Sequence, residues 1–231
     1  MGWGKLIGVF LGMTLVFGMQ NGPASAEEAG AHRIAVSGAA VERILVLGDS
    51  LSAEYGLPRG SGWVSLISQR LAEADQAYQI RNASISGDTT GNGLQRLPPI
   101  LDEFQPDLVI LQLGANDGLR GLPVNDMKSN LSKIISLIQA SGARVLLLGQ
   151  HIPPNYGKQY ADRFHAVYGE LAQEHGVELV PFMLDAIALD ATMFQPDGLH
   201  PTVEAQESIV DTVWHKLAEV LGQMNGNKKS P

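Results

Sequence analysis

Short runs of apolar residues recur along the chain, and each run is bounded by glycine, proline or polar residues. This pattern is typical of strands, and the unbroken run Leu108–Leu113 is typical of a strand buried on both faces. The predicted strands are Arg43–Leu47, YQIRNAS from Tyr78, Leu108–Leu113, RVLLLGQ from Arg144 and VELVPF from Val177.

Between these runs, apolar positions repeat at intervals of three and four residues, which predicts amphipathic helices. The first contains Val64, Ile67 and Leu71, and the second runs from about Asn125 to Ala140. A third starts near Tyr160 and ends at Gly176, and the last covers Val203–Leu221. Strands that alternate with helices predict an α/β fold. We expect three α/β/α layers around about five parallel strands, in the flavodoxin-like order 2-1-3-4-5.

The amino-terminal region has the layout of a secretory signal peptide. Lys5 precedes an apolar run from Leu6 to about Met19, and Ala24-Ser25-Ala26 forms a small-residue cleavage site. We expect cleavage after Ala26 and export to the periplasm or the medium, although the same run would also fit an uncleaved anchor. The predicted organisation is a signal peptide over 1–26, a flexible lead-in over 27–40 and a single folded domain over 41–231. The chain has no cysteine, which excludes a lipoprotein anchor and disulfides.

The formal charge of the chain is −8, and loss of Lys5 with the signal peptide makes it one unit more negative. Nucleic acids and anionic membranes bind poorly without a basic patch, so we expect neither as the main partner. No second apolar segment is long enough to cross a bilayer, which predicts no stable membrane insertion after signal cleavage. The sequence does not indicate an oligomeric state.

Four polar segments follow the carboxyl ends of predicted strands, where ligands bind in parallel sheets. Ser50 follows the first strand, between the loops that hold Gly87 and Asn116 if the strand order is 2-1-3. A serine hydroxyl becomes a nucleophile when a base takes its proton, and His200 is the candidate base. Asp197, three residues earlier, can hold the imidazole in the required tautomer. The Ser50 amide, the Gly87 amide and the Asn116 side chain are candidate oxyanion donors.

Each of these residues also has an ordinary structural interpretation. Ser50 alone fits a helix cap, Gly87 a turn, Asn116 a turn residue, and His200 a surface residue before a helix. Their joint occurrence, in this order and at one sheet edge, favours acyl transfer. A silent binding module for an acyl group or a sugar is the alternative, and labelling of Ser50 by a phosphonate or a sulfonyl fluoride would separate the two.

The segments GDSLS, SGDT, GAND and DGLHP resemble the ordered blocks of the SGNH, or GDSL, hydrolase family across the chain after the signal peptide. The resemblance is greatest to exported bacterial arylesterases and to multifunctional thioesterases with protease and lysophospholipase activity. It implies Ser50 as nucleophile, His200 as base oriented by Asp197, and Gly87 and Asn116 as oxyanion donors. The implied substrates are aryl esters, acyl-CoA and lysophospholipids, with carbohydrate O-deacetylation or acyl transfer on the same residues as the alternative.

Other chemistries find little support in the sequence. A G-x-S-x-G elbow, a P-loop, a G-x-G-x-x-G segment and a clustered metal-ligand pattern are all missing, so we expect no cofactor and no metal. Two further loops border the same edge and carry candidate substrate-binding residues that would form an apolar groove; the alternative is that they only cover the sheet. These residues are Leu119, Leu122, Pro153, Pro154 and Tyr156.

Overall fold

The structure is a computed structural model, and it describes residues 41–73 and 77–228 apart from the side chains of Pro154, Asn227 and Lys228. The predicted signal peptide (1–26) and lead-in (27–40) lie outside the described residues. All described residues belong to one compact unit, Gly38–Pro231. No helix within the described ranges is both long enough and apolar enough to span a bilayer.

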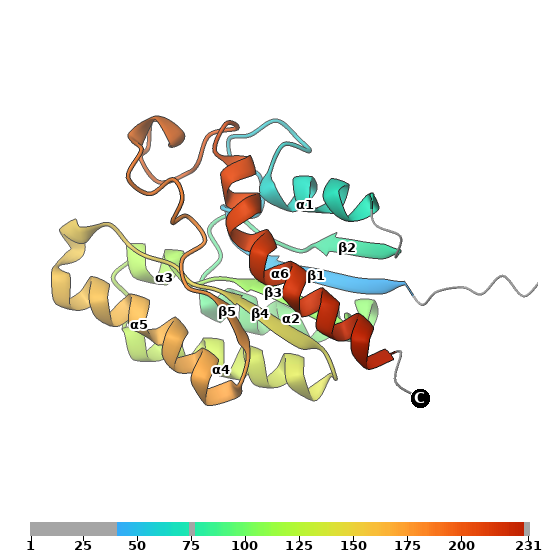
Figure 1. Ribbon diagram of the computed structural model, residues 1–231. Coiled ribbons are helices and arrows are strands. Elements are labelled where there is room, and N and C mark those ends of the chain that lie inside the picture. Colours follow the sequence, from blue (N-terminus) through green and yellow to red (C-terminus); the bar gives the residue numbers. More distant parts are fainter. Residues whose placement is uncertain (1–40, 74–76, 229–231) are drawn as a thin grey trace, which may run out of the picture. The chain divides into compact units, whose positions relative to one another are not determined.

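A five-stranded parallel sheet forms the centre of this unit, with the order β2-β1-β3-β4-β5 (Figure 1). The predicted fold class and strand order are therefore confirmed. The three central strands are almost wholly buried, which explains their unbroken apolar runs. The strands are β1 (Glu42–Gly48), β2 (Tyr78–Asn82), β3 (Leu108–Gln112), β4 (Arg144–Leu148) and β5 (Glu178–Val180).

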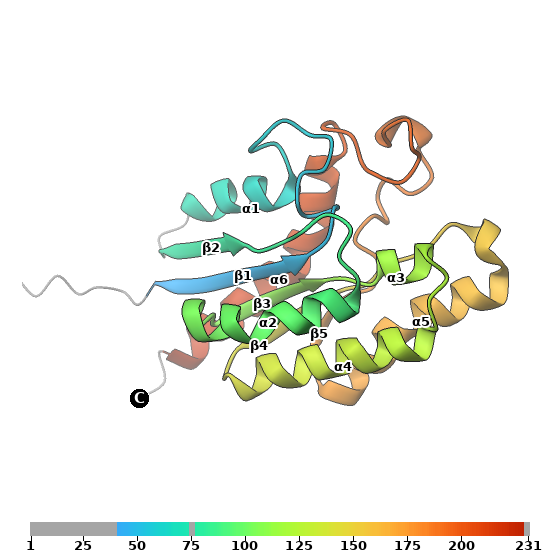
Figure 2. The ribbon, with the colours of Figure 1, turned by 180° about the vertical axis from the view of Figure 1, so that it is seen from behind.

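Helices cover both faces of the sheet and make two separate apolar cores (Figures 1 and 2). Alternate residues of β1 point to opposite faces, so Ile44 and Val46 join one core while Leu45 and Leu47 join the other. The first core lies under α1 (Trp63–Ala72) and α6 (Gln206–Lys228). The second lies under α2 (Thr90–Phe104), α4 (Val124–Ala140) and α5 (Lys158–His175).

One of these helices, α2, is not among those that the hydrophobic pattern predicts. Its interior contains Pro98 and Pro99, which are unfavourable inside a helix because they lack the backbone N–H. The helix begins with a capping box in which the Thr89 side chain accepts from the Asn92 amide and Asn92 bonds back to the Thr89 amide. Burial of its apolar face, including Leu97, stabilises the helix in spite of the prolines.

The last helix also differs from its predicted bounds, because α6 begins at Gln206 and not at Val203. Before it, the chain makes an antiparallel bridge between Phe194 and Pro201, and the Thr202 amide donates to the Met193 carbonyl. These contacts keep residues 201–205 out of the helix and hold them beside the carboxyl ends of the strands. The loops after all five strands therefore meet at one edge of the sheet.

Candidate active site

The turn that carries Ser50 is built by the residues around it. Gly48 ends β1 in a crowded place, where a Cβ would lie 2.7 Å from the Gln112 side-chain oxygen. Asp49 is fully buried, and its Oδ1 accepts from the Leu51 amide at 3.1 Å and from Gln112 Nε2 at 2.9 Å. Burial raises the pKa of Asp49 to about 6. The hydrogen bond from Gln112 attaches the turn to the neighbouring strand β3, of which Gln112 is the last residue.

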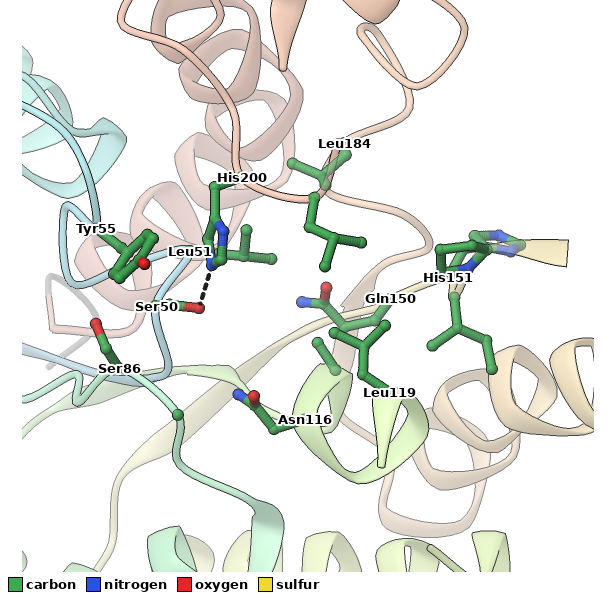
Figure 3. Close-up of a pocket in the computed structure, with 15 residues that line it drawn as sticks. Ser50, Leu51, Tyr55, Ser86, Asn116, Leu119, Gln150, His151, Leu184 and His200 are labelled. Carbon is green, nitrogen blue, oxygen red and sulfur yellow. Dashed lines mark hydrogen bonds between the residues drawn. The ribbon is translucent and has the colours of Figure 1, made fainter. Parts of the chain in front are cut away.

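Ser50, His200 and Asp197 form a continuous hydrogen-bonded chain although 150 residues separate the serine from the histidine. The Ser50 Oγ lies 2.9 Å from His200 Nε2 (Figure 3). On the other side of the ring, His200 Nδ1 lies 2.7 Å from Asp197 Oδ2. The structure thus brings together the three residues that the sequence predicts as a catalytic set.

The Asp197 carboxylate is held as an anion by its own turn. Its Oδ1 accepts from the amides of Leu199 at 2.9 Å and His200 at 3.0 Å. Partial burial alone would raise the pKa of Asp197, but the bonds from the His200 amide and ring and from the Leu199 amide outweigh it and lower the pKa to about 2. An ionised Asp197 accepts the Nδ1 proton of His200, which leaves Nε2 free to take a proton from Ser50.

Gly87 and Asn116 lie beside Ser50 at the wall of the same cavity. Gly87 has φ 84, a left-handed conformation that favours glycine. Asn116 lies in the short helix α3 (Ala115–Leu119), and its Nδ2 donates to the Asp88 carbonyl at 3.0 Å. This bond fixes the amide orientation and uses one of its two hydrogens, so the second can serve a ligand. Figure 3 shows the Asn116 amide facing the space beside Ser50.

Two arginines brace the loop that carries Gly87, and sequence reasoning missed both. Arg120 donates to the Gly87 carbonyl at 2.7 Å. Arg96, on α2, pairs with the Asp88 carboxylate at 2.6 Å and also donates to the carbonyls of Gly48, at 3.2 Å, and of Ala83. Arg96 therefore ties the turn that carries Ser50 to the loop that carries Gly87. No local motif marks it, because its partners come from two other segments of the chain.

Ser50, Asn116 and His200 open into a cavity of about 330 Å³ with a mostly apolar wall. Leu119 and Pro153 line it, as predicted, whereas Leu122 and Tyr156 do not. The Tyr156 hydroxyl instead donates to the Leu119 carbonyl at 2.9 Å. The Leu122 and Tyr156 side chains are both exposed. The side chain of Pro154 is not described. Other apolar lining residues, which the sequence pattern did not single out, are Leu51, Ile152, Leu184 and Leu199.

Within the described ranges, no group of three histidine, cysteine, aspartate or glutamate side chains is placed to hold a metal ion. The chain's own groups suffice for acyl transfer. A base is in contact with a nucleophile, an anion orients the base, and amide donors lie beside the nucleophile. Such an arrangement can attack a carbonyl carbon and stabilise the tetrahedral oxyanion that follows.

Comparison with known proteins gives related sequences and structures. The model of the GDSL-like Lipase/Acylhydrolase family matches residues 46–207. An arylesterase of Vibrio mimicus is 50% identical over 79% of this chain and 91% of its own. Thioesterase 1/protease 1/lysophospholipase L1 of Escherichia coli is 40% identical over 79% of this chain and 86% of its own. The crystal structure of the esterase EstA from Pseudoalteromonas sp., inhibited by monoethylphosphonate, matches with a TM-score of 0.75 and 38% identity over 78% of this chain and 99% of its own.

Proposed function

Because the chain belongs to the GDSL-like lipase/acylhydrolase family, we propose that it hydrolyses carboxylic esters and thioesters through an acyl-enzyme on Ser50. The observation that carries this proposal is the chain of contacts from Ser50 Oγ to His200 Nε2, at 2.9 Å, and from His200 Nδ1 to Asp197, at 2.7 Å. A protein that only binds a ligand has no need for a histidine whose ring is oriented by a carboxylate and whose Nε2 contacts a serine hydroxyl.

The first half of the reaction forms the acyl-enzyme. Ser50 Oγ attacks the substrate carbonyl carbon while its proton moves to His200 Nε2. The amides of Ser50 and Gly87 and the Asn116 side chain stabilise the negative charge that develops on the carbonyl oxygen. The bond to the leaving oxygen or sulfur then breaks, and His200 returns the proton to the leaving group.

The second half releases the acid. A water molecule enters where the leaving group was, and His200 takes its proton as it attacks the acyl carbonyl. The intermediate collapses, the carboxylic acid leaves, and Ser50 Oγ recovers its proton from His200. Asp197 remains ionised throughout and stabilises the imidazolium on each side of the cycle.

The apolar cavity wall supports acyl substrates over acetylated sugars, because sugar hydroxyls need more polar partners than this wall offers. Aryl esters, acyl-CoA and lysophospholipids share an acyl carbonyl and a leaving oxygen or sulfur that departs more easily than the nitrogen of an amide. These classes agree with the names of the relatives. Ordinary amides should react more slowly because their nitrogen must be protonated before it leaves.

Export is the second part of the proposal, and it rests on the sequence. Lys5, the apolar run after it and the Ala24-Ser25-Ala26 site support cleavage after Ala26. The intact mass of protein recovered outside the cytoplasm would test this. A product that still carries residues 1–26 would contradict it.

Covalent labelling tests the central proposal. A phosphonate should label the wild-type protein at Ser50 and abolish hydrolysis of an aryl ester, and Ser50→Ala should neither be labelled nor hydrolyse the ester. Ser136→Ala is the matched control, because Ser136 is exposed on α4, donates to the Ser132 carbonyl and does not line the cavity, so labelling should be unchanged. A Ser50→Ala protein that retains substantial turnover would refute the mechanism. So would stoichiometric labelling at another residue.

A further inference from the structure

Exposed apolar side chains gather in the loops at the edge of the sheet that holds the cavity. The described residues expose nine large hydrophobic side chains, and seven of them lie in loops that follow the carboxyl ends of strands. The other two lie toward the opposite edge of the sheet, Val41 just before β1 and Leu137 near the end of α4. The seven, which we call the apolar rim, are Tyr55, Ile85, Leu122, Tyr156, Leu189, Leu199 and Val203.

Three residues of the apolar rim connect it to the site. The Tyr55 ring lies against the His200 ring, with centroids 4.4 Å apart, and both line the cavity. Leu199 lines the cavity and also an adjoining, mostly apolar hollow of about 610 Å³. Leu189 lies at this hollow with a relative exposure of 102%. Apolar surface therefore extends from the catalytic histidine outward to solvent.

Hydrogen bonds hold the chain at or beside two of these exposed positions. The Tyr55 carbonyl accepts from Gln195 Nε2 at 3.0 Å. Next to Leu189, the Asp190 carboxylate accepts from the amide and the hydroxyl of Thr192, at 2.9 and 2.6 Å. Single exposed apolar residues are common on soluble proteins, but their concentration around one opening marks an interaction surface.

The charges on these loops restrict the partner. Asp185, Asp190 and Glu204 are exposed acids on the segment after β5. The described loops carry the cations Arg59 and Arg120, and Lys158 follows at the start of α5. Arg120 donates to the Gly87 carbonyl, and Lys158 pairs with Asp162 at 2.6 Å. An anionic membrane attracts clusters of basic residues, which these loops do not provide. A surface of zwitterionic head groups fits an apolar rim with acidic neighbours.

We propose that the apolar rim docks the protein on aggregates of zwitterionic single-chain lipids, so that a lipid passes from the aggregate directly into the cavity. This inference rests on the proposed esterase function and identifies the physical form of one substrate class. Docking transfers apolar side chains from water into an apolar layer, which is favourable for each side chain buried. The open mouth of the cavity then lies against the layer that supplies the substrate.

The test compares two substrates and two surface variants. The substrates are a short, water-soluble aryl ester and lysophosphatidylcholine, measured below and above its critical micelle concentration. The rim variant is the double substitution Ile85→Ser and Leu189→Ser. The matched control is Leu137→Ser. It removes an exposed leucine near the end of α4, toward the edge of the sheet opposite the cavity loops.

We expect the wild-type rate on lysophosphatidylcholine to rise steeply once micelles form. The kcat/KM of the rim variant on micelles should be lower by about ten-fold or more, because the variant lacks two apolar side chains that the lipid layer would bury on docking. Its rate on the aryl ester should stay within two-fold of the wild type. Leu137→Ser should leave both rates unchanged. Vesicle flotation should show stronger retention on phosphatidylcholine than on phosphatidylserine.

Three results would overturn the inference: an unchanged micellar rate in the rim variant, an equal loss on both substrates, or preferential binding to phosphatidylserine. A dimer in the wild type that becomes a monomer in the rim variant, seen by analytical ultracentrifugation, would also overturn it by assigning the rim to a second copy of the chain. If the wild type fails to hydrolyse the soluble ester, the proposed function itself is wrong. The two failures are therefore distinguishable.

Discussion

Replacement of Asn116 by alanine distinguishes between a catalytic and a purely structural role of the Asn116 side-chain amide. In the structure, Asn116 Nδ2 donates to the Asp88 carbonyl at 3.0 Å, and the same NH₂ group has a second hydrogen for the oxyanion. A purely structural Asn116 would contribute one hydrogen bond in a partly buried site. Its loss would lower the free energy of unfolding by about 1 kcal/mol and leave the chemistry of folded molecules unchanged.

The catalytic role predicts a much larger effect on turnover. Removal of one oxyanion donor costs about 10²–10³ in kcat, or roughly 3–4 kcal/mol of transition-state stabilisation. Asn116→Ala should therefore lower kcat and kcat/KM together, with little change in KM, and lower stability by only about 1 kcal/mol. Asn116→Asp should be at least as harmful, because a carboxylate faces both the Asp88 carbonyl and the developing oxyanion without donating a hydrogen bond.

The assay is steady-state hydrolysis of a soluble aryl ester, combined with urea unfolding of each variant. Gln139→Ala is the matched control, since Gln139 Nε2 also donates to a backbone carbonyl, that of His175 at 2.9 Å, and does not line the cavity. The control should lose stability and keep kcat. An Asn116→Ala or Asn116→Asp enzyme with kcat near that of the wild type would remove Asn116 from the mechanism.

Three further predictions concern the groups that hold the site. Arg96→Ala should lower kcat about ten-fold at unchanged KM, and Arg96→Lys should recover part of kcat, because lysine keeps the charge but not the several donors of the guanidinium group. Arg81→Ala is the control, because Arg81 forms an exposed ion pair with Glu103. An equal loss of kcat in that control would contradict the idea. The pKa of Asp49 is raised from 3.8 to about 6, so its contribution to stability is fully present below pH 4 and is lost as the pH rises through 6. Asp49→Asn should flatten this decline in urea unfolding, and a wild-type curve that keeps rising from pH 4 to 7 with no difference from the variant would refute it. The pKa of Asp197 is lowered from 3.8 to about 2, so its contribution is present above pH 4 and is lost as the pH falls through 2. Asp197→Asn should therefore destabilise at pH 6 but not at pH 2, with kcat lower by up to about 10⁴, and a stability difference that persists at pH 2 would count against this reading.

The elements that sequence reasoning predicted are those with a strong local signal. Apolar runs marked the central strands β1, β3 and β4, because strands buried on both faces have no polar side. The edge strand β2 is less buried and carries polar residues between its apolar ones. Helix α2 escaped because two interior prolines contradict local helix propensity, and only tertiary burial of its apolar face reveals why it forms. The start of α6 was misplaced for a similar reason, since pairing of residues 193–194 with 201–202 keeps the chain extended there.

The amino-acid sequence by itself determined the chemistry of the site. Ser50, Asp197 and His200 are recognisable because short turns carry them in a fixed order, and parallel strands must deliver those turns to one edge of the sheet. Only the tertiary structure decided what supports and surrounds them. Arg96, the cavity wall and the apolar rim depend on side chains from distant segments that meet in space. Hydrophobic periodicity depends on residues that are near one another in the sequence. The contacts of Arg96, the shape of the cavity and the exposure of the rim depend on residues that are distant in the sequence and near in space.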